Sequence, residues 1–174
     1  MRELFVLDKK NYNPNGSVGR RPSVRGIIIR AGKIAMMHSK KYNYYKLPGG
    51  GIEPGETLED TLIREVREES GLIVKPETIK EFGYVRRIEK GRFEDIFIQD
   101  NYYFLCEAES TIIEQQLDDY EAEEQFTLEF VSITDAISVN ESANHFEKEN
   151  IATFRGMIDR ENKVLSLLLA EHKI

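Results

Sequence analysis

A short segment of this chain, from Gly50 to Leu72, carries a glycine-rich turn followed by a crowded group of acidic side chains. The members of this acidic cluster are Glu56, Glu65, Glu68 and Glu69. Carboxylates packed this closely repel each other unless cations lie among them, and hard divalent cations prefer oxygen ligands. The segment therefore predicts a site for a divalent metal ion.

The cluster is carried by a helix whose two ends are marked in the sequence. Thr57 is a favourable N-cap, and Asp60 three residues later completes a capping-box pattern. Gly71 can adopt the left-handed conformation that ends a last turn, so we expect a helix from Thr57 to Ser70.

The spacing of side chains gives this helix two distinct faces. At about 100° per residue, Leu62, Ile63 and Val66 share an apolar face, and the last three glutamates of the cluster lie on an adjoining one. Arg64 precedes Glu68 by one turn and can pair with it, which would orient that carboxylate. One face packs against a core and the other is available for chemistry.

The spacing of these residues resembles the signature of the Nudix hydrolases. That signature is a glycine, five residues, a glutamate, seven residues, Arg-Glu, an aliphatic residue, any residue, Glu-Glu, any residue, a glycine and an aliphatic residue. The chain has every fixed position, with Gly50, Glu56, Arg64, Glu65, Glu68, Glu69 and Gly71, and with Val66 and Leu72 at the aliphatic positions. An acidic helix without such spacing would be interpreted as an ordinary solvated surface.

The resemblance implies a fold and a reaction. The fold would be an α/β/α sandwich with a mixed β-sheet. The reaction would be the metal-dependent cleavage of a pyrophosphate bond in a nucleoside diphosphate linked to another moiety, such as a nucleotide sugar, an ADP-ribose-like compound or a nucleoside triphosphate. Water would attack one phosphorus, and the protein would place that water and stabilise the developing charge.

The resemblance also implies metal ligands. The carbonyl oxygen of Gly50 and the carboxylates of Glu65, Glu68 and Glu69 would bind one or more Mg²⁺ or Mn²⁺ ions, and Glu56 would contribute directly or through water. Glycines from Gly49 to Gly51 suit this site because backbone without side chains can approach metal and phosphate closely.

The general base has two possible origins in the family, a carboxylate on the helix or a glutamate from a later loop. Glu65 is the helix candidate, and the acidic run from Glu114 to Glu124 offers Glu121, Glu123 and Glu124. We favour Glu124 because it immediately precedes a predicted strand, although such a run is also typical of a solvated loop.

Substrate contacts are expected near the glycine turn. Tyr42, Tyr44 and Tyr45 precede it, and Arg25 or Arg30 can meet a phosphate, depending on which face of a strand each occupies. The residues that we expect to bind substrate are Arg25, Tyr45, Gly49 and Gly51. The proline of the ADP-ribose branch is replaced by Ile88, and the coenzyme A motif is missing, so the substrate stays open.

Composition is consistent with one domain over residues 1–174. A chain of this length with 40% hydrophobic residues can bury a full core, and no linker or repeat divides it. The net charge of −7 argues against binding a nucleic-acid polymer, whereas divalent metal would let a small anionic substrate bind. Cys106, the only cysteine, is expected to be a buried strand residue.

No targeting or membrane-spanning segment is evident. The apolar stretches from Leu4 to Leu7 and from Val164 to Ala170 are too short for a signal peptide or a membrane helix, so we expect a soluble cytoplasmic protein.

Alternating apolar residues predict a sheet in the middle of the chain, after a polar loop from Asn11 to Pro22. The predicted strands are Arg2–Asp8, Ser23–Arg30 and Lys33–His38 joined as a hairpin, Leu72–Val74, the antiparallel pair Lys80–Ile88 and Ile96–Cys106, and Phe126–Val131. Thr134 is expected to cap a short helix through Val139. The segment from Phe146 to Lys173 reads as one or two helices that either seal the core or form a homodimer interface.

Two other classes of function remain open. An isomerase on the same fold needs a catalytic cysteine near the glycine turn, and Cys106 lies far from it in the chain. A non-catalytic nucleotide-sensing domain would usually have an incomplete signature, and here the signature is whole.

Overall fold

A mixed β-sheet forms the centre of the computed structural model, which describes residues 1–142 and 151–171. Its main path runs in the order β1-β7-β8-β3-β4-β10, with β2 paired to β8 and β5 paired to β4. The strands are β1 (Glu3–Asp8), β2 (Val18–Arg20), β3 (Ser23–Arg30), β4 (Lys33–Ser39), β5 (Tyr44–Lys46), β7 (Lys80–Glu89), β8 (Ile96–Cys106) and β10 (Phe126–Val131). Because β1–β7, β2–β8 and β3–β8 are parallel and the other pairs antiparallel, the sheet is mixed as expected.

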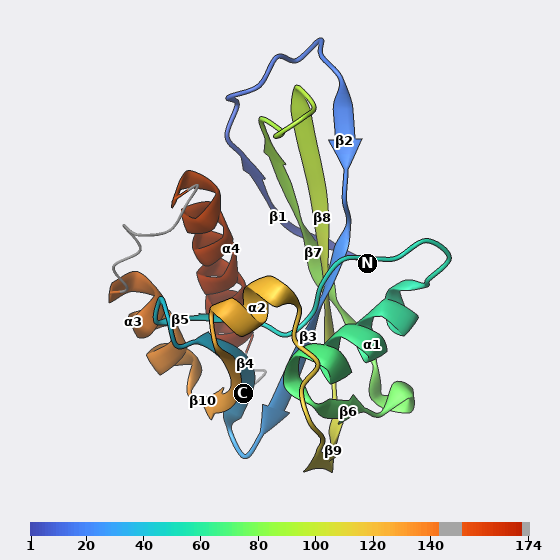
Figure 1. The fold of residues 1–174 in the computed structure, drawn as a ribbon, viewed down its shortest axis with the longest axis vertical. Helices are drawn as coiled ribbons and strands as arrows, with labels where there is room; N and C mark the ends of the chain where they lie inside the picture. The colour runs from blue at the N-terminus through green and yellow to red at the C-terminus, as the bar shows by residue number, and fades with distance from the viewer. Residues whose placement is uncertain (143–150, 172–174) are drawn as a thin grey trace.

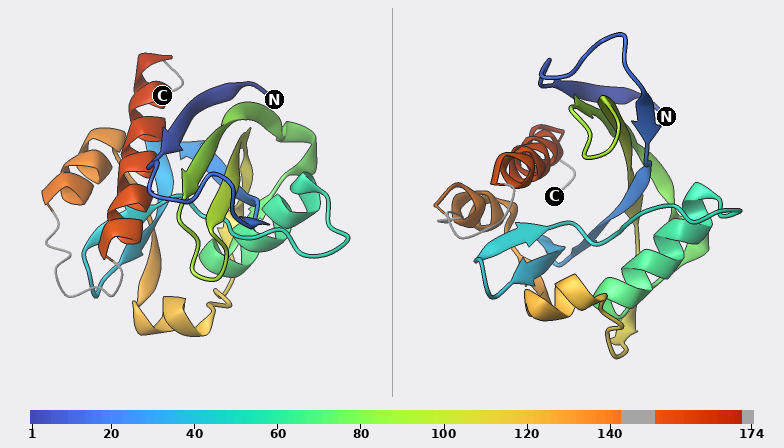
Figure 2. Two further views of the ribbon diagram at one scale, coloured as in Figure 1. Left: turned by 90° about the horizontal axis from the view of Figure 1, so that it is seen from above. Right: turned by 45° about the horizontal axis from the view of Figure 1, so that its top comes forward.

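Helices lie on both faces of this sheet (Figures 1 and 2). The helix α1 (Leu58–Ser70) covers one face, and α3 (Ile133–Ser142) and α4 (Ile151–Ala170) cover the other. A short helix, α2 (Asp119–Glu123), leads into β10, and β6 (Leu72–Val74) pairs with β9 (Ala108–Ile112) beyond the end of α1. A single 3₁₀ turn spans Pro76–Thr78 within the described residues. The expected α/β/α architecture is confirmed.

Alternation along β3 divides the core between the two faces. Val24 and Ile28 pack with Leu62 and Val66 of α1, whereas Ile27 packs in a second cluster against α3 and α4. Each fully buried aliphatic side chain of this kind contributes about 1.5–3 kcal/mol. Helices therefore pack on both faces of the sheet, and the segment between β5 and α1 lies at the edge of the sheet.

Both ends of α1 agree with the sequence prediction. The Thr57 hydroxyl accepts a hydrogen bond from the Asp60 N–H at 3.1 Å, and the Asp60 carboxylate accepts one from the Thr57 N–H at 3.2 Å. Gly71 ends the helix with φ 72° and ψ 4°, and its N–H donates to the Arg67 carbonyl at 2.9 Å. These caps place the acidic face of α1 in a defined register relative to the glycine turn.

Several local predictions need correction. The polar loop from Asn11 to Pro22 contains β2, which pairs with the part of β8 that extends beyond β3. Ser132, and not Thr134, caps α3, because its hydroxyl accepts from the Asp135 N–H at 3.1 Å. The acidic run includes α2, whose capping box is formed by Asp118 and Glu121.

The C-terminal helix and Cys106 have defined places in the core. Val164, Leu165 and Leu168 of α4 are buried against the sheet, so this part of the apolar surface seals the core of its own chain. The predicted positions 146–150, 172 and 173 lie outside the described residues. Cys106 is a buried residue of β8, as expected. Among the described helices, none is long and apolar enough to cross a membrane.

The end of α1 allows a stability test at Gly71. A Cβ atom here would lie 2.1 Å from the carbonyl oxygen of Ile113, whereas a Cβ atom at Gly32, with nearly the same φ of +73°, meets nothing within 4 Å. Gly32→Ala should lower the free energy of unfolding by about 1 kcal/mol through backbone strain alone. Gly71→Ala should lower it by about 1–3 kcal/mol more through overlap.

Urea denaturation of both variants measures these losses, with Gly32→Ala as the matched control for left-handed strain. Equal losses in the two variants would show that close packing against Ile113 contributes nothing at this helix end.

Candidate active site

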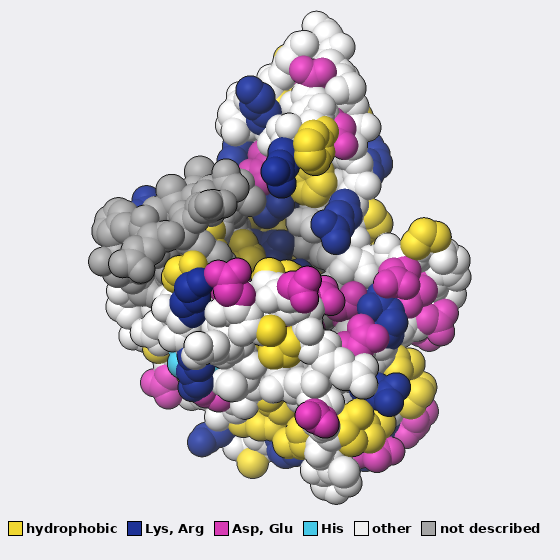
Figure 3. Space-filling model, in the orientation of Figure 1, with side chains coloured by type: hydrophobic (Ala, Val, Ile, Leu, Met, Phe, Trp, Pro, Cys, Tyr) yellow, Lys and Arg dark blue, Asp and Glu magenta, His cyan; other side chains and the backbone are white. Residues whose placement is uncertain are grey.

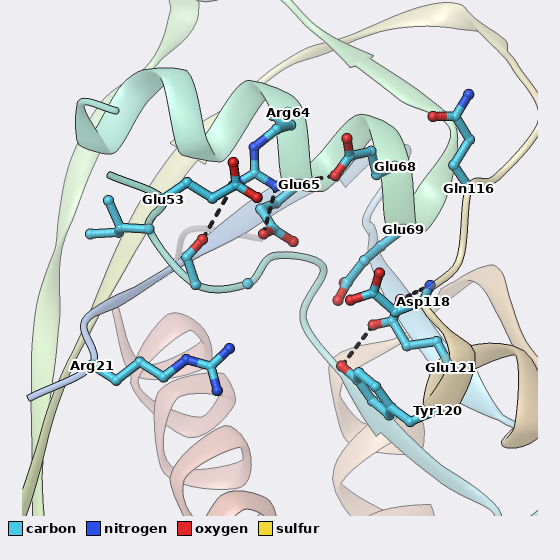
Figure 4. A pocket seen from close by; sticks show the side chains of 13 residues that line it. Arg21, Glu53, Arg64, Glu65, Glu68, Glu69, Gln116, Asp118, Tyr120 and Glu121 are labelled. Atoms are coloured by element: carbon cyan, nitrogen blue, oxygen red, sulfur yellow. Dashed lines mark hydrogen bonds and ion pairs between the residues drawn. The ribbon is translucent and has the colours of Figure 1, made fainter. Parts of the chain in front are cut away.

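A cavity of about 260 Å³ opens beside α1, the glycine turn and α2. Figure 4 shows its acidic side chains turned toward a common space, with Arg21 extending toward them from the opposite side. The lining residues are Arg21, Gly50, Gly51, Ile52, Glu53, Arg64, Glu65, Glu68, Glu69, Gln116, Asp118, Tyr120 and Glu121. The fold thus gathers most of the expected site residues around one cavity.

Arg64 holds three members of the acidic cluster. Its Nε and Nη2 donate to the two carboxylate oxygens of Glu56 at 2.6 and 2.8 Å. Its Nη1 donates to Glu65 at 2.8 Å and to Glu68 at 3.1 Å. The hydrogen bonds from this guanidinium lower the pKa of Glu56 to about 2. Arg64 therefore orients more of the cluster than the single carboxylate expected from sequence.

Lys46 of β5 holds the fourth member. Its Nζ donates to Glu69 at 2.9 Å and to Glu121 of α2 at 2.8 Å. All three side chains are buried, with 5%, 4% and 3% of the residue surface exposed respectively. Burial raises the pKa of Glu69, although the Lys46 charge opposes that change. The second oxygen of Glu69 accepts the Gly49 N–H at 2.8 Å, which ties α1 to the glycine turn.

Gly50 is a position where the absence of a side chain has a direct structural reason. A Cβ atom here would lie 2.2 Å from Oε2 of Glu65, so this carboxylate occupies the space above the glycine. Burial raises the pKa of Glu65. The Gly50 carbonyl accepts the Val24 N–H at 2.9 Å, which connects the turn to β3.

Glu124 and Tyr45, both expected in the site, lie outside this cavity. Glu124 accepts hydrogen bonds from the hydroxyls of Tyr44 at 2.7 Å and Ser39 at 3.1 Å. Tyr45 stacks on His38, with ring centroids 4.3 Å apart. For Tyr45 the reason is alternation along β5, because Lys46 is directed to the acidic cavity and Tyr45, its neighbour, is directed to the opposite face.

Sequence reasoning missed Lys46, Arg21 and Tyr120. Lys46 directly precedes Leu47-Pro48 in the sequence, and a cation next to an acidic cluster is a signal for ion pairing. The Tyr120 hydroxyl donates to Glu121 at 2.9 Å and accepts from the Lys46 ammonium at 3.3 Å. The acidic segment before β10 also contributes Asp118 to the cavity, which no local pattern indicates.

The residues present have the chemistry of a divalent-metal site. Six carboxylates line the cavity together with the glycine turn, and the space above Gly50 admits a carboxylate where any side chain would exclude it. Within residues 1–142 and 151–171, no three acidic, histidine or cysteine side chains are already arranged as a metal cage. Arg64 and Lys46 hold these oxygens instead, so metal entry must exchange some of their hydrogen bonds.

Comparison of the sequence with known proteins gives a family match and partial relatives. A family model described as the NUDIX domain matches residues 19–154. The ADP-ribose pyrophosphatase of Methanocaldococcus jannaschii is 40% identical over 60 residues, which are 33% of this chain and 36% of the relative. The putative 8-oxo-dGTP diphosphatase YtkD of Bacillus subtilis is 30% identical over 95 residues, 55% of this chain and 54% of the relative. The chain spans between about a third and about half of these relatives.

Two solved structures share the fold. The MutT protein from Bacillus halodurans has a TM-score of 0.55 at 18% identity, covering 68% of this chain and 72% of that one. A NUDIX hydrolase from Nitrosomonas europaea has a TM-score of 0.55 at 15% identity, covering 83% of this chain and 91% of that one. Because the family model matches most of the chain, the chain belongs to the NUDIX family.

Proposed function

We propose that this chain is a divalent-metal-dependent hydrolase that cleaves a pyrophosphate bond in a nucleoside diphosphate linked to another moiety. The observation that carries the proposal is the complete signature, whose helix carboxylates Glu65, Glu68 and Glu69 line one cavity beside a glycine turn, with Glu56 held next to them by Arg64. The names of partial relatives, an ADP-ribose pyrophosphatase and a putative 8-oxo-dGTP diphosphatase, support the same class of bond.

The residues that would hold Mg²⁺ or Mn²⁺ are Gly50, through its carbonyl, Glu56, Glu65, Glu68 and Glu69. When bound, the ion supplies charge stabilisation for diphosphate oxygens and a polarised water. Arg64 keeps the helix carboxylates oriented, and Lys46 compensates the negative charge of the buried pair Glu69 and Glu121. Gly49 and Gly51 keep the backbone open to the phosphates, and Arg21 is available for a phosphate oxygen.

For the general base, we propose Glu121 or Glu65 in place of Glu124. Both line the cavity, and Glu124 does not. A base must reach the attacking water within about 3 Å or through one further water, so position decides before pKa does.

The experiment that tests the function is incubation of the purified chain with a panel of nucleoside triphosphates, nucleotide sugars and dinucleotides, with Mg²⁺ or Mn²⁺. Product masses identify the bond cleaved, and ¹⁸O-labelled water identifies the phosphorus attacked. Activity should disappear in chelator and return with metal. Binding without cleavage of every compound would instead support the sensor alternative.

A glycine pair tests the space above the turn. Gly50→Ala should displace the Glu65 carboxylate, because the added Cβ would lie 2.2 Å from its oxygen, and turnover should fall about 100-fold, as expected for a displacement near 1 Å. Gly32→Ala is the control, since Gly32 lies outside the cavity lining and an added Cβ there meets nothing within 4 Å. Steady-state kinetics with equal loss in both variants would contradict this role for Gly50.

Carboxylate substitutions on α1 test the metal ligands. Glu65→Gln and Glu69→Gln should each lower kcat by about 100-fold or more, because each removes a charged oxygen donor. Glu59→Gln, on the exposed side of the same helix, is the control and should retain near-normal turnover. Glu69→Gln should also lower the unfolding free energy by about 1–3 kcal/mol, since Lys46 then loses a charged partner.

Isothermal titration with Mn²⁺ should show weaker metal binding in the two cluster variants and unchanged binding in Glu59→Gln. Normal metal uptake and turnover in both cluster variants would show that these carboxylates are not the ligands.

The later glutamates are separated by a second pair of variants. Glu121→Gln should lower kcat by about 100-fold, within the usual range for a general base. Glu124→Gln should lower the melting temperature, because Tyr44 loses a charged acceptor at 2.7 Å, but should leave kcat within about threefold. A larger loss of kcat in Glu124→Gln than in Glu121→Gln would restore the assignment made from sequence.

A further inference from the structure

Arg25 of β3 carries a positive charge on the face of the sheet opposite α1. It shares this face with Ile27, which packs in the cluster against α3 and α4. Its Nε and Nη1 are buried and have no hydrogen-bond partner among the described residues. Arg30 lies on the other face, where it stacks over Phe130 at 4.9 Å and donates to the Glu109 carbonyl at 2.7 Å. One arginine of this strand is thus satisfied and the other is not.

Arg87 of β7 repeats the contrast on a second strand. Its neighbour Arg86 forms a two-pronged pair with Asp100 at 2.7 and 2.9 Å. Arg87 is only 9% exposed, and its Nε has no partner in the described part of the chain. Its Nη2 lies 3.2 Å from Glu89, and its guanidinium lies over the Phe97 ring at 5.6 Å.

Between these two arginines, a third guanidinium is fully engaged. Nη1 of Arg160 on α4 donates to the side-chain oxygen of Asn101 at 2.7 Å, and that oxygen also accepts from the Ser23 hydroxyl at 2.9 Å. The partner carboxylate of Arg160 is Glu161 at 2.8 Å. Because Asn101 and Ser23 face each other across β8 and β3, Arg160 lies beside Arg25 on the same face.

The three arginines Arg25, Arg87 and Arg160 outnumber the buried carboxylates that pair with them. The buried carboxylates paired with the arginines are Glu89 and Glu161, and each has another partner, Lys9 for the first and the Leu47 N–H for the second. Burial, with the positive charges of Arg160 and Arg25, lowers the pKa of Arg87. A buried cation without a full set of acceptors is costly, and an anion would remove that cost.

The basic face adjoins the acidic cavity through the glycine turn. A Cβ atom at Gly49 would lie 2.3 Å from the Val24 carbonyl oxygen and 3.0 Å from the Cα of Arg25, so the glycine turn packs on the backbone of β3 at this point. Figure 3 shows Lys and Arg side chains inside a hollow of the surface, with acidic side chains along its edge. Burial raises the pKa of Glu65 and Glu69 in the acidic cavity and the charge of Arg25 acts to lower it, whereas Arg87 borders a separate cavity with Asp8, Lys9 and Asp159.

We propose that Arg25 and Arg87 form an anion subsite that binds a phosphate group of the substrate other than the diphosphate at the metal. This inference rests on the proposed function for its assignment to substrate. It favours substrates with a third phosphate or another phosphorylated end, such as nucleoside triphosphates, over nucleoside diphosphates linked to a neutral sugar.

The test uses inorganic pyrophosphate and the metal-free protein in chelator, so that binding is measured without hydrolysis. Calorimetry should show pyrophosphate binding to the wild-type chain, and Arg25→Met and Arg87→Met should weaken it at least tenfold. The matched controls are Arg30→Met and Arg86→Met, which remove the same charge from the other face of the same strands and should stay within twofold.

A stability measurement distinguishes binding from a structural role. Because two buried nitrogens of Arg25 have no partner among the described residues, Arg25→Met should raise the melting temperature without ligand by about 2–4 °C while weakening pyrophosphate binding. Arg87→Lys keeps the charge and should recover part of the affinity lost in Arg87→Met.

The subsite would be overturned if the control variants weakened binding equally. It would also be overturned if the wild type bound no pyrophosphate. The proposed function can fail while the subsite holds. In that case Arg25→Met and Arg87→Met still lose pyrophosphate binding, but the wild type hydrolyses no nucleotide. If hydrolysis occurs, Arg25→Met should raise KM for a nucleoside triphosphate at least tenfold more than KM for a nucleotide sugar.

Discussion

The compensation of crowded negative charge is the constraint on which the site depends. Two protein cations meet it, Arg64 within the helix and Lys46 from β5. Lys46 has the wider structural effect, because its ammonium joins Glu69 of α1 to Glu121 of α2 in a buried contact. Without a cation between them, these two carboxylates would each face desolvation and repulsion, which would oppose the packing of α2 over the end of α1.

The glycine turn separates two chemically opposite surfaces at very short range. On one side, Glu65 fills the space above Gly50. On the other, Gly49 packs on the backbone of β3 at Val24 and Arg25. A side chain at Gly50 would overlap Glu65, and one at Gly49 would overlap this backbone. A polyphosphate is suited to such a junction, since metal-bound oxygens can face the carboxylates while other oxygens face guanidinium groups.

Local signals in the sequence were sufficient for the elements that carry the signature. The caps of α1 at Thr57 and Gly71, the hairpin at Ala31-Gly32 and the antiparallel pair β7–β8 depend on neighbouring residues or on short-range alternation. The errors fall where long-range contacts decide. The strand β2 forms because β8 offers it a free edge, and α3 begins after Ser132, the residue that follows the end of β10.

The sequence by itself determined the family, the acidic helix and the presence of glycine beside it, because spacing along one helix fixes which side chains share a face. Only the tertiary structure decided which distant residues complete the site. It brought Lys46 and Glu121 to Glu69, and it turned Tyr45 and Glu124 away from the cavity. It also placed Arg25 on the basic face rather than beside Arg30. Which face a strand residue occupies depends on what covers the sheet, and that is set by contacts between segments far apart in the chain.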